Sequence, residues 1–334
     1  MPFMYSLLAI DHLKTWFPVR RGLFSRVAGH VRAVDGVSMS MEKGKTVGLV
    51  GESGCGKSTL ARTIVGLEKA TGGTIHFNGQ NILSMSAHAM KPVRRNLQMV
   101  FQDPFSSLNP RMNVMDIITE GMVEHGMIRR RERKAEAVRL LHDVGMGPHA
   151  LHRYPHEFSG GQRQRISIAR ALSLQPQLII CDEAVSALDV SIQAQVINLL
   201  MDLRDRHGLS YLFISHDLSV VRHIADTILV MYLGGIVEQG PAQAVIDTPL
   251  HPYTRALISA IPRIDGKTKN RLVLHGDVPS PSNPPSGCHF HPRCSYATEQ
   301  CAKQPPPLTS ADENGQRQVA CFHYATIPPF QTTR

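Results

Sequence analysis

The sequence predicts an α/β fold built on a layered parallel sheet. Two short apolar runs, 178–181 and 211–215, have the composition of parallel strands that are buried on both faces. Each run ends at polar residues and precedes a helical pattern, and residues 46–50 form a third buried strand that leads through a glycine loop into a helix. Strands that alternate with helices form a layered sheet, whose ligands bind at the carboxyl ends of the strands.

Length and hydropathy indicate a cytosolic chain. The 334 residues are enough for about two domains of ~150 residues each, and 42% of them are hydrophobic. No apolar run reaches the ~18 residues that a membrane span needs. The first residues lack the layout of a signal peptide, because Asp11 and His12 follow the short apolar run at once. We therefore expect the protein to be made and kept in the cytosol.

The net charge of +9 favours nucleic acid or an anionic membrane surface as partners. The largest basic run, 129–134, opens a predicted helix and is better explained as a solvated helix face. Aromatic residues make up only 6% of the chain, which weakens any case for base stacking. We expect no nucleic-acid partner.

The chain divides into a nucleotide-binding domain over 1–255 and an extension over 256–334. Residues 7–50 indicate short strands, in which 20–30 is expected to be a loop. Helical patterns replace strand patterns over about 105–175, which predicts a helical insertion. The extension is proline-rich and poorly helical, so we do not expect a second enzyme domain there.

The glycine loop fits the phosphate-binding pattern G-x-x-x-x-G-K-[ST]. Its glycines let backbone N–H groups close on phosphate oxygens, and the helix start adds a positive dipole. Lys57 is expected to reach the β- and γ-phosphates, and the Ser58 hydroxyl to bind Mg²⁺. The candidate nucleotide-binding residues of this P-loop are Gly51, Glu52, Ser53, Gly54, Cys55, Gly56, Lys57, Ser58 and Thr59.

Two carboxylates end the apolar strand 178–181. Asp182 is expected to hold Mg²⁺, directly or through water, and Glu183 to orient or deprotonate the attacking water. A surface Asp-Glu pair would not usually follow a wholly apolar strand. Gln102 ends the strand 97–101, so it is expected at the same edge of the sheet.

A second glycine-rich helix start is formed by Ser159, Gly160, Gly161 and Gln162. One lysine-bearing P-loop and two phosphate-type helix starts can serve one nucleotide only if two chains face each other. Together these motifs resemble the ATP-binding cassette (ABC) family of transporter ATPases. The resemblance implies a P-loop NTPase with an antiparallel β subdomain, a helical insertion and, here, a cysteine-containing extension.

The family resemblance assigns further roles to residues. Ser159–Gln162 is similar to the signature motif, Ser186–Asp189 to the D-loop, Gln102 to the Q-loop and His216 to the switch histidine. Phe17 matches the adenine-stacking aromatic, although the neighbouring Trp16 is an alternative. The implied catalytic residues are Lys57, Gln102, Glu183 and His216; the implied Mg²⁺ ligands are Ser58, Gln102 and Asp182.

Two positions depart from the family pattern. Phe158 stands where leucine usually precedes the signature, and Ala184 replaces the proline that usually follows Asp-Glu. Since Glu183 is intact, we expect activity to survive the loss of the proline.

A narrower resemblance concerns the substrate. It is carried by segments 109–111, 251–254, 279–281 and 287–288. These look like the ATPases of oligopeptide and dipeptide importers, and most like the F-type subunit, which pairs with a distinct D-type ATPase. The resemblance implies a peripheral protein on the cytoplasmic face of the inner membrane, with two permease subunits and, indirectly, a substrate-binding protein. Glutathione or nickel import and a soluble cassette ATPase acting on nucleic acid or ribosomes are the alternatives.

Four of the six cysteines lie in the extension, at Cys288, Cys294, Cys301 and Cys321. Four thiols in a segment with little core suggest a structural metal or an iron–sulfur cluster, although the spacing is not a C-x₂-C zinc pattern. Resemblance to the importer subfamily makes a [4Fe–4S] cluster the better hypothesis. Four unligated thiols are an equal alternative, and His289, His291 and His323 are other candidate ligands.

Overall fold

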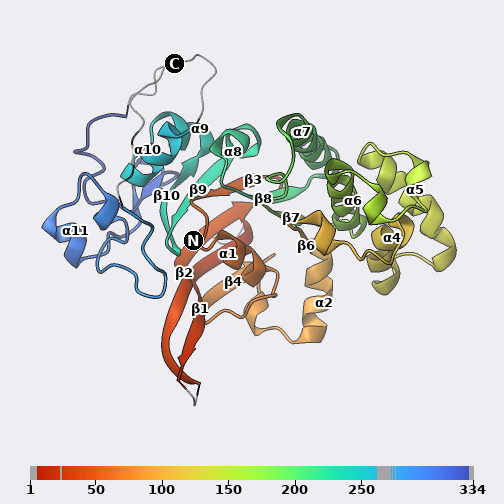
Figure 1. Cartoon of the computed structure of the whole chain (residues 1–334), viewed down its shortest axis with the longest axis horizontal. Helices are drawn as coiled ribbons and strands as arrows, with labels where there is room; N and C mark the ends of the chain where they lie inside the picture. Colours follow the sequence, from red (N-terminus) through yellow and green to blue (C-terminus); the bar gives the residue numbers. More distant parts are fainter. Residues whose placement is uncertain (1–5, 23–24, 262–271, 273, 275, 331–334) are drawn as a thin grey trace. The chain divides into compact units, whose positions relative to one another are not determined.

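The computed structural model describes residues 6–22, 25–261, 272, 274 and 276–330. The chain forms two compact units (Figure 1). The first unit contains residues 1–41, 46–83 and 215–334, and the second contains 42–45 and 84–214. The predicted boundary between residues 255 and 256 falls inside a helix, α10 (Pro252–Ser259).

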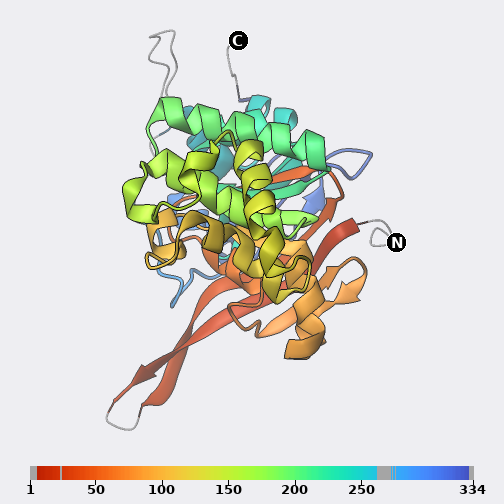
Figure 2. The ribbon, with the colours of Figure 1, turned by 90° about the vertical axis from the view of Figure 1, so that its right-hand side faces the viewer.

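The first sheet of the first unit has four strands in the order β2-β1-β4-β5. Their bounds are β1 Ser6–Arg21, β2 Arg26–Glu42, β4 Gly72–Phe77 and β5 Gln80–Asn81. Strands β1 and β4 run antiparallel, with Leu8 opposite Phe77 and Ile10 opposite Ile75. The prediction of a loop over 20–30 is wrong over most of that stretch, because β1 and β2 continue into it as a long hairpin (Figure 2).

The P-loop strand belongs to a second group of strands in this unit. β3 (Thr46–Val50) is buried at every residue and pairs parallel with β9 (Thr227–Tyr232). β9 pairs antiparallel with β10 (Gly235–Pro241). The extension adds β12 (Gln318–Val319), which pairs with β10, and β11 (Thr309–Ser310), which pairs with β12. The extension therefore continues the sheet of the cassette.

Helix α1 (Lys57–Ile64) follows the P-loop and packs on β1, where the hydroxyl oxygens of Thr15 and Thr63 lie 3.0 Å apart. The remaining helices of this unit are short. They are η1 Ile82–Ser84, α8 Leu218–Ile224, α9 Ala242–Asp247, α10 Pro252–Ser259, η5 His291–Arg293 and α11 Glu299–Lys303.

The second unit contains the predicted parallel strands. β6 (Leu97–Val100), β7 (Leu178–Asp182) and β8 (Ser210–Ser215) pair in that order, with Ile180 opposite both Met99 and Leu212. Every residue of β7 and β8 is buried, as their apolar composition predicts. Two helices flank these strands in the chain, α2 Ala87–Asn96 and α7 Val190–His207.

The predicted helical insertion occupies the rest of the second unit (Figures 1 and 2). Its elements are α3 Pro104–Ser107, α4 Val114–Glu124, η2 Arg130–Glu132, α5 Arg133–Asp143, η3 Pro148–Ala150, η4 Pro155–Glu157 and α6 Gly160–Ser173. Helices α4, α5 and α6 pack on one another through buried aliphatic side chains such as Ile118, Leu140 and Ile166. Of the described helices, none combines the length and the hydropathy of a membrane span.

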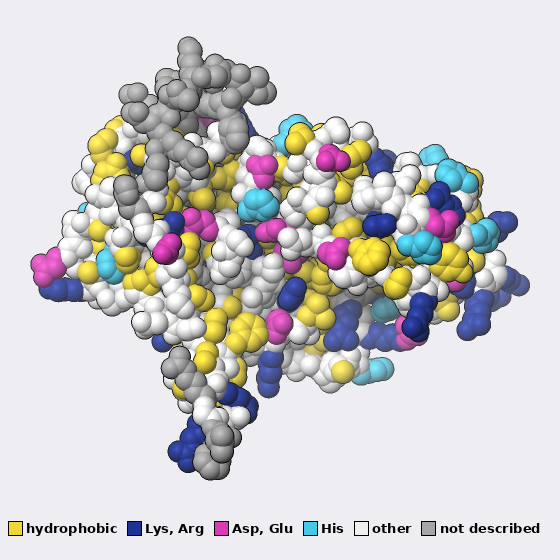
Figure 3. All heavy atoms as spheres, viewed as in Figure 1, with side chains coloured by type: hydrophobic (Ala, Val, Ile, Leu, Met, Phe, Trp, Pro, Cys, Tyr) yellow, Lys and Arg dark blue, Asp and Glu magenta, His cyan; other side chains and the backbone are white. Residues whose placement is uncertain are grey.

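The basic run 129–134 lies at the start of α5 and is mostly exposed. Glu132 and Arg133 are half-buried, and Arg133 forms an ion pair with Asp116 and donates to the Thr119 hydroxyl over 2.8 Å. On the face drawn in Figure 3, Lys and Arg side chains over the helical unit are interspersed with acidic and histidine side chains. This distribution is that of a solvated helix face, as the sequence predicts.

Candidate functional site

The P-loop connects β3 to α1 in the first unit. Gly56 has a φ of +108°, and a Cβ atom at this position would lie 1.9 Å from the Ala33 carbonyl oxygen. Only glycine fits both the backbone conformation and this close approach. Glycine at position 56 therefore lets the backbone turn tightly into the start of α1, the end of a helix at which anions bind.

The Lys57 ammonium contacts the backbone of the P-loop. It donates to the carbonyl oxygens of Gly51, over 2.8 Å, and Glu52, over 2.9 Å, and the residue is only 4% exposed. A buried ammonium next to a helix N-terminus concentrates positive charge where polyphosphate oxygens would bind. Ser58, the next residue, presents the kind of hard oxygen ligand that Mg²⁺ prefers.

Trp16 and Phe17, the two candidates for adenine stacking, differ in their surroundings. Lys14 and Arg32 lie over the Trp16 ring, 5.5 and 4.9 Å from its centre, and the Trp16 indole nitrogen is buried. Phe17 is 36% exposed, so its ring is accessible to a base. These contacts are consistent with Phe17 as the stacking residue, and its role stays a prediction.

In the second unit, Gln102 and Glu183 come together at the ends of β6 and β7. The Gln102 side-chain amide donates to the Glu183 carboxylate over 3.1 Å. Glu183 has a φ of +48°, a left-handed conformation that costs a non-glycine residue about 1 kcal/mol. Its backbone is fixed by N–H donation to Ile214 O over 3.0 Å and by the Ser186 hydroxyl, which donates to its carbonyl oxygen over 2.9 Å.

Asp182 is the last residue of β7 and is 3% exposed, so its carboxylate is suited to hold a cation. His216 directly follows β8, is exposed and belongs to the first unit. The next residue, Asp217, caps α8 by accepting from the Ser219 N–H over 2.8 Å.

The signature residues form the start of α6. The Ser159 hydroxyl accepts from the Gln162 N–H over 3.4 Å, and the Gln162 side chain accepts from the Ser159 N–H over 3.1 Å. This reciprocal capping box stops the first turn from fraying. A Cβ atom on Gly161 would lie 2.5 Å from Ile192 Cγ2, so the helix start packs directly against the region after the D-loop.

Comparisons with known proteins agree with these motifs. A family model described as ABC transporter matches residues 34–186, and a model of the oligopeptide/dipeptide transporter C-terminal region matches residues 237–301. The oligopeptide transport ATP-binding protein AppF of Bacillus subtilis is 55% identical over 324 residues, which cover 96% of this chain and 98% of the relative. This chain belongs to the ABC transporter ATPases.

Other relatives of this cassette ATPase have similar coverage. The di/tripeptide transport ATP-binding protein DppF of Pseudomonas aeruginosa is 50% identical, over 96% of this chain and 98% of its own length. The oligopeptide transport ATP-binding protein OppF of Escherichia coli is 52% identical, over 95% and 96%. The two family models together reach both the P-loop and the extension.

Solved structures confirm the fold of the cassette. The structure of cbiO1 from Clostridium perfringens, part of an ABC transporter complex, has a TM-score of 0.62 and 25% identity, and covers 72% of this chain and 90% of its own. A dimeric ATP-binding cassette bound to ADP and Pi also has a TM-score of 0.62, with 23% identity, over 70% and 98%.

Two cysteines of the cassette ATPase are buried outside the extension. Burial raises the pKa of Cys55, against the opposing effect of the Lys57 ammonium, and raises the pKa of Cys181 to about 12. Because the thiolate is the reactive form, neither thiol should react with N-ethylmaleimide at pH 8 in the folded chain. Peptide mapping by mass spectrometry measures this, with the guanidinium-unfolded chain as the control. Rapid labelling of Cys55 that ATP prevents would contradict the expectation.

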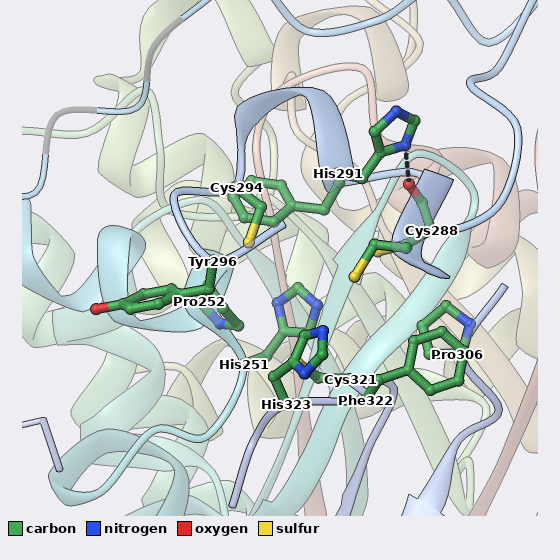
Figure 4. Close-up of a pocket in the computed structure, with 12 residues that line it drawn as sticks. His251, Pro252, Cys288, His291, Cys294, Tyr296, Pro306, Cys321, Phe322 and His323 are labelled. Atoms are coloured by element: carbon green, nitrogen blue, oxygen red, sulfur yellow. Dashed lines mark hydrogen bonds between the residues drawn. The ribbon is translucent and has the colours of Figure 1, made fainter. Parts of the chain in front are cut away.

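The extension gathers its four cysteines around one cavity of about 20 Å³, room for about one water molecule (Figure 4). His251, His291 and His323 also line it, and the His291 ring nitrogen Nδ1 lies 2.9 Å from the Cys288 carbonyl oxygen. Burial, and then the neighbouring thiols, raise the pKa of Cys294 to about 11. Within the described ranges, no group of three or more His, Cys, Asp or Glu side chains is arranged to hold a metal ion.

Two side chains that contact the P-loop carry no recognisable signal for this role in the sequence. The Tyr253 hydroxyl accepts from the Glu52 N–H over 2.8 Å, and Arg293 forms an ion pair with the Glu52 carboxylate. Neither belongs to a phosphate-binding motif. Arg293 is 241 positions from Glu52, so no local pattern could have indicated the contact.

Proposed function

We propose that this cassette ATPase energises the uptake of di- or oligopeptides through a membrane permease. The observation that carries the proposal is that the similarity to peptide transport ATP-binding proteins extends beyond the cassette, through the region matched over residues 237–301. A cassette match alone would leave the cargo open.

Within this function, each candidate residue has a role at a composite ATP site. The P-loop residues Gly51–Thr59 bind the phosphates and Phe17 stacks on adenine. Ser58, Asp182 and Gln102 hold Mg²⁺, which neutralises charge that develops on the phosphates. Glu183 acts on the attacking water, and His216 contacts the γ-phosphate region. The hydrogen bond from Gln102 to Glu183 supports a shared role for these two side chains.

The same proposal gives the chain its partners. Ser159–Gln162 completes the ATP site of a second, distinct ABC ATPase, whose own signature completes this one. The ATPase pair acts on two permease subunits at the cytoplasmic face of the inner membrane, and a substrate-binding protein delivers the cargo. The exposed capping box of α6 supports this arrangement, because it leaves the signature accessible to another chain.

Reconstituted vesicles that contain the permease pair, both ATPases and the binding protein test the cargo. ATP supplied on the face of the membrane that carries the ATPase subunits should drive transport of a radiolabelled dipeptide to that face. Parallel assays with labelled glutathione and Ni²⁺ provide the comparison. A complex that accumulates glutathione or nickel but no peptide would overturn the peptide assignment. Salt-sensitive RNA binding without any transport would overturn the transporter function itself.

The [4Fe–4S] cluster on Cys288, Cys294, Cys301 and Cys321 is part of the proposal. The gathering of four thiols at one cavity supports it, whereas the lack of a formed ligand group in the described part of the chain speaks against it. Protein purified without oxygen should contain about four iron and four acid-labile sulfide atoms per chain. Colourless, iron-free protein with four titratable thiols in the extension would refute the cluster.

A further inference from the structure

The extension contacts the P-loop through a bidentate ion pair. Arg293, the last residue of η5, donates to both carboxylate oxygens of Glu52, over 2.7 and 3.0 Å. The Arg293 side chain is 7% exposed and that of Glu52 is 26% exposed. Paired parallel hydrogen bonds between a guanidinium and a carboxylate fix both the position and the orientation of the acid. Glu52 is the second residue of the P-loop, so this contact fixes the loop itself.

Aromatic side chains hold the arginine and the loop in place. The Tyr253 hydroxyl accepts the Glu52 N–H over 2.8 Å, and the Tyr232 hydroxyl accepts from Arg293 over 3.5 Å. The two tyrosine rings meet edge to face with centres 4.7 Å apart, and both tyrosines are almost fully buried. Phe290, three residues before Arg293, packs on both rings. Arg293 therefore reaches Glu52 from a packed group of buried aromatic rings.

The charge at position 52 makes this contact important for ATP. A polyphosphate binds where positive charge collects, and a carboxylate within the same loop opposes it. The Glu52 carbonyl oxygen accepts from the Lys57 ammonium over 2.9 Å, so the backbone of Glu52 adjoins the main candidate phosphate ligand. The Arg293 guanidinium contacts both carboxylate oxygens of Glu52, so it neutralises their negative charge. The same contact orients the carboxylate toward the extension.

We propose that Arg293 is a positioning residue for ATP binding: it neutralises the Glu52 carboxylate and holds it on the C-terminal extension, away from the path of the triphosphate. This role rests on the proposed nucleotide site at Gly51–Ser58 and is independent of the cargo. It gives the extension a part in the ATPase reaction, because the segment that carries Cys288 and Cys294 also carries the arginine.

Binding of ATP to the full-length chain, measured by isothermal titration calorimetry, tests the role. Arg293→Met should raise Kd for ATP about tenfold, the size of a typical coupling between neighbouring sites. Adding Glu52→Gln removes the unpaired carboxylate, so the double variant should regain most of the lost affinity. Unchanged affinity in Arg293→Met, or a double variant as weak as the single one, would overturn the proposal.

Arg317→Met is the matched control. Arg317 also lies in the extension and pairs with a core acid, Glu238, over 3.1 Å, but it contacts no residue of the P-loop. Arg317→Met should lower Tm and leave Kd for ATP within about twofold of the wild type. It weakens the packing of the extension but leaves the Glu52 carboxylate paired with Arg293.

Two further variants distinguish an error in the role of Arg293 from an error in the proposed nucleotide site. If Arg293→Met does not fold, Arg293→Lys replaces it: lysine keeps the charge but loses the paired hydrogen bonds, so Kd should rise by less than about tenfold and adding Glu52→Gln should restore it. A loss of affinity that Glu52→Gln does not restore would contradict the proposal. Normal ATP binding by Lys57→Ala would overturn the proposed nucleotide site itself. Wild-type binding in Arg293→Met together with lost binding in Lys57→Ala would overturn only the role of Arg293.

Discussion

Replacing Glu183 with glutamine should lower kcat for ATP hydrolysis by roughly 10²–10⁴-fold while ATP still binds. Glutamine has the shape of glutamate and can still accept the 3.1 Å hydrogen bond from Gln102. It cannot take a proton from the attacking water. The change therefore removes the proposed general base without disturbing the strained turn at φ +48°. Phosphate release by the assembled transporter at saturating ATP measures kcat, and a separate titration measures ATP binding.

The control for Glu183→Gln is Glu136→Gln. Glu136 lies on α5 and pairs with Arg139 at the surface, over 2.9 Å. Such exposed pairs contribute little, so kcat should stay within about twofold of the wild type. Unchanged ATP-driven uptake by the Glu183 variant would show that another group activates the water.

Replacing Lys57 with alanine should raise Kd for ATP by about 100-fold or more. The ammonium would make charge-assisted hydrogen bonds to phosphate oxygens, and each such bond contributes about 1.5–3 kcal/mol. The structure places the ammonium at the P-loop, 2.8 Å from the Gly51 carbonyl oxygen. Nucleotide titration of the full-length variant measures the change.

Lys91→Ala is the matched control for Lys57→Ala. Lys91 contacts Glu124 over 3.1 Å, with side chains 50% and 74% exposed, so its loss should leave both Kd and Tm nearly unchanged. The substitution Lys57→Ala also removes the hydrogen bonds to the carbonyl oxygens of Gly51 and Glu52, so it could destabilise the fold. A thermal unfolding scan of this variant must therefore accompany the titration. Retained ATP affinity in a folded Lys57→Ala chain would refute the assigned role.

Local patterns were sufficient to predict the central elements. Strands β3, β7 and β8 are apolar at nearly every position because both of their faces are buried, and this composition is visible in the sequence. The P-loop and the signature are equally local, since glycines and capping side chains act within a few residues. The parallel strands also place Gln102 near Glu183, as the rule for strand ends predicts.

Other features depend on distant contacts and left no local signal. The hairpin of β1 and β2 has exposed residues near its tip, Val27 and Ala28 among them, and alternation between buried and exposed positions is lost there. The left-handed backbone of Glu183 is imposed by Ile214 and Ser186. The extension has a loop-like composition, yet β12 is specified by pairing with β10, and β11 by pairing with β12. Only the fold brings Arg293 to the P-loop.

The short strand β12 has a consequence for how the cassette can be cut. It covers the free edge of β10, with Ala320 N–H donating to the Val237 carbonyl oxygen over 2.8 Å. A chain shortened after α10 would expose that edge, and Glu238, whose side chain is fully buried, would lose the Arg317 charge. Unpaired strand edges recruit strands from other molecules. We therefore expect such a fragment to self-associate edge to edge, because β12 no longer covers β10.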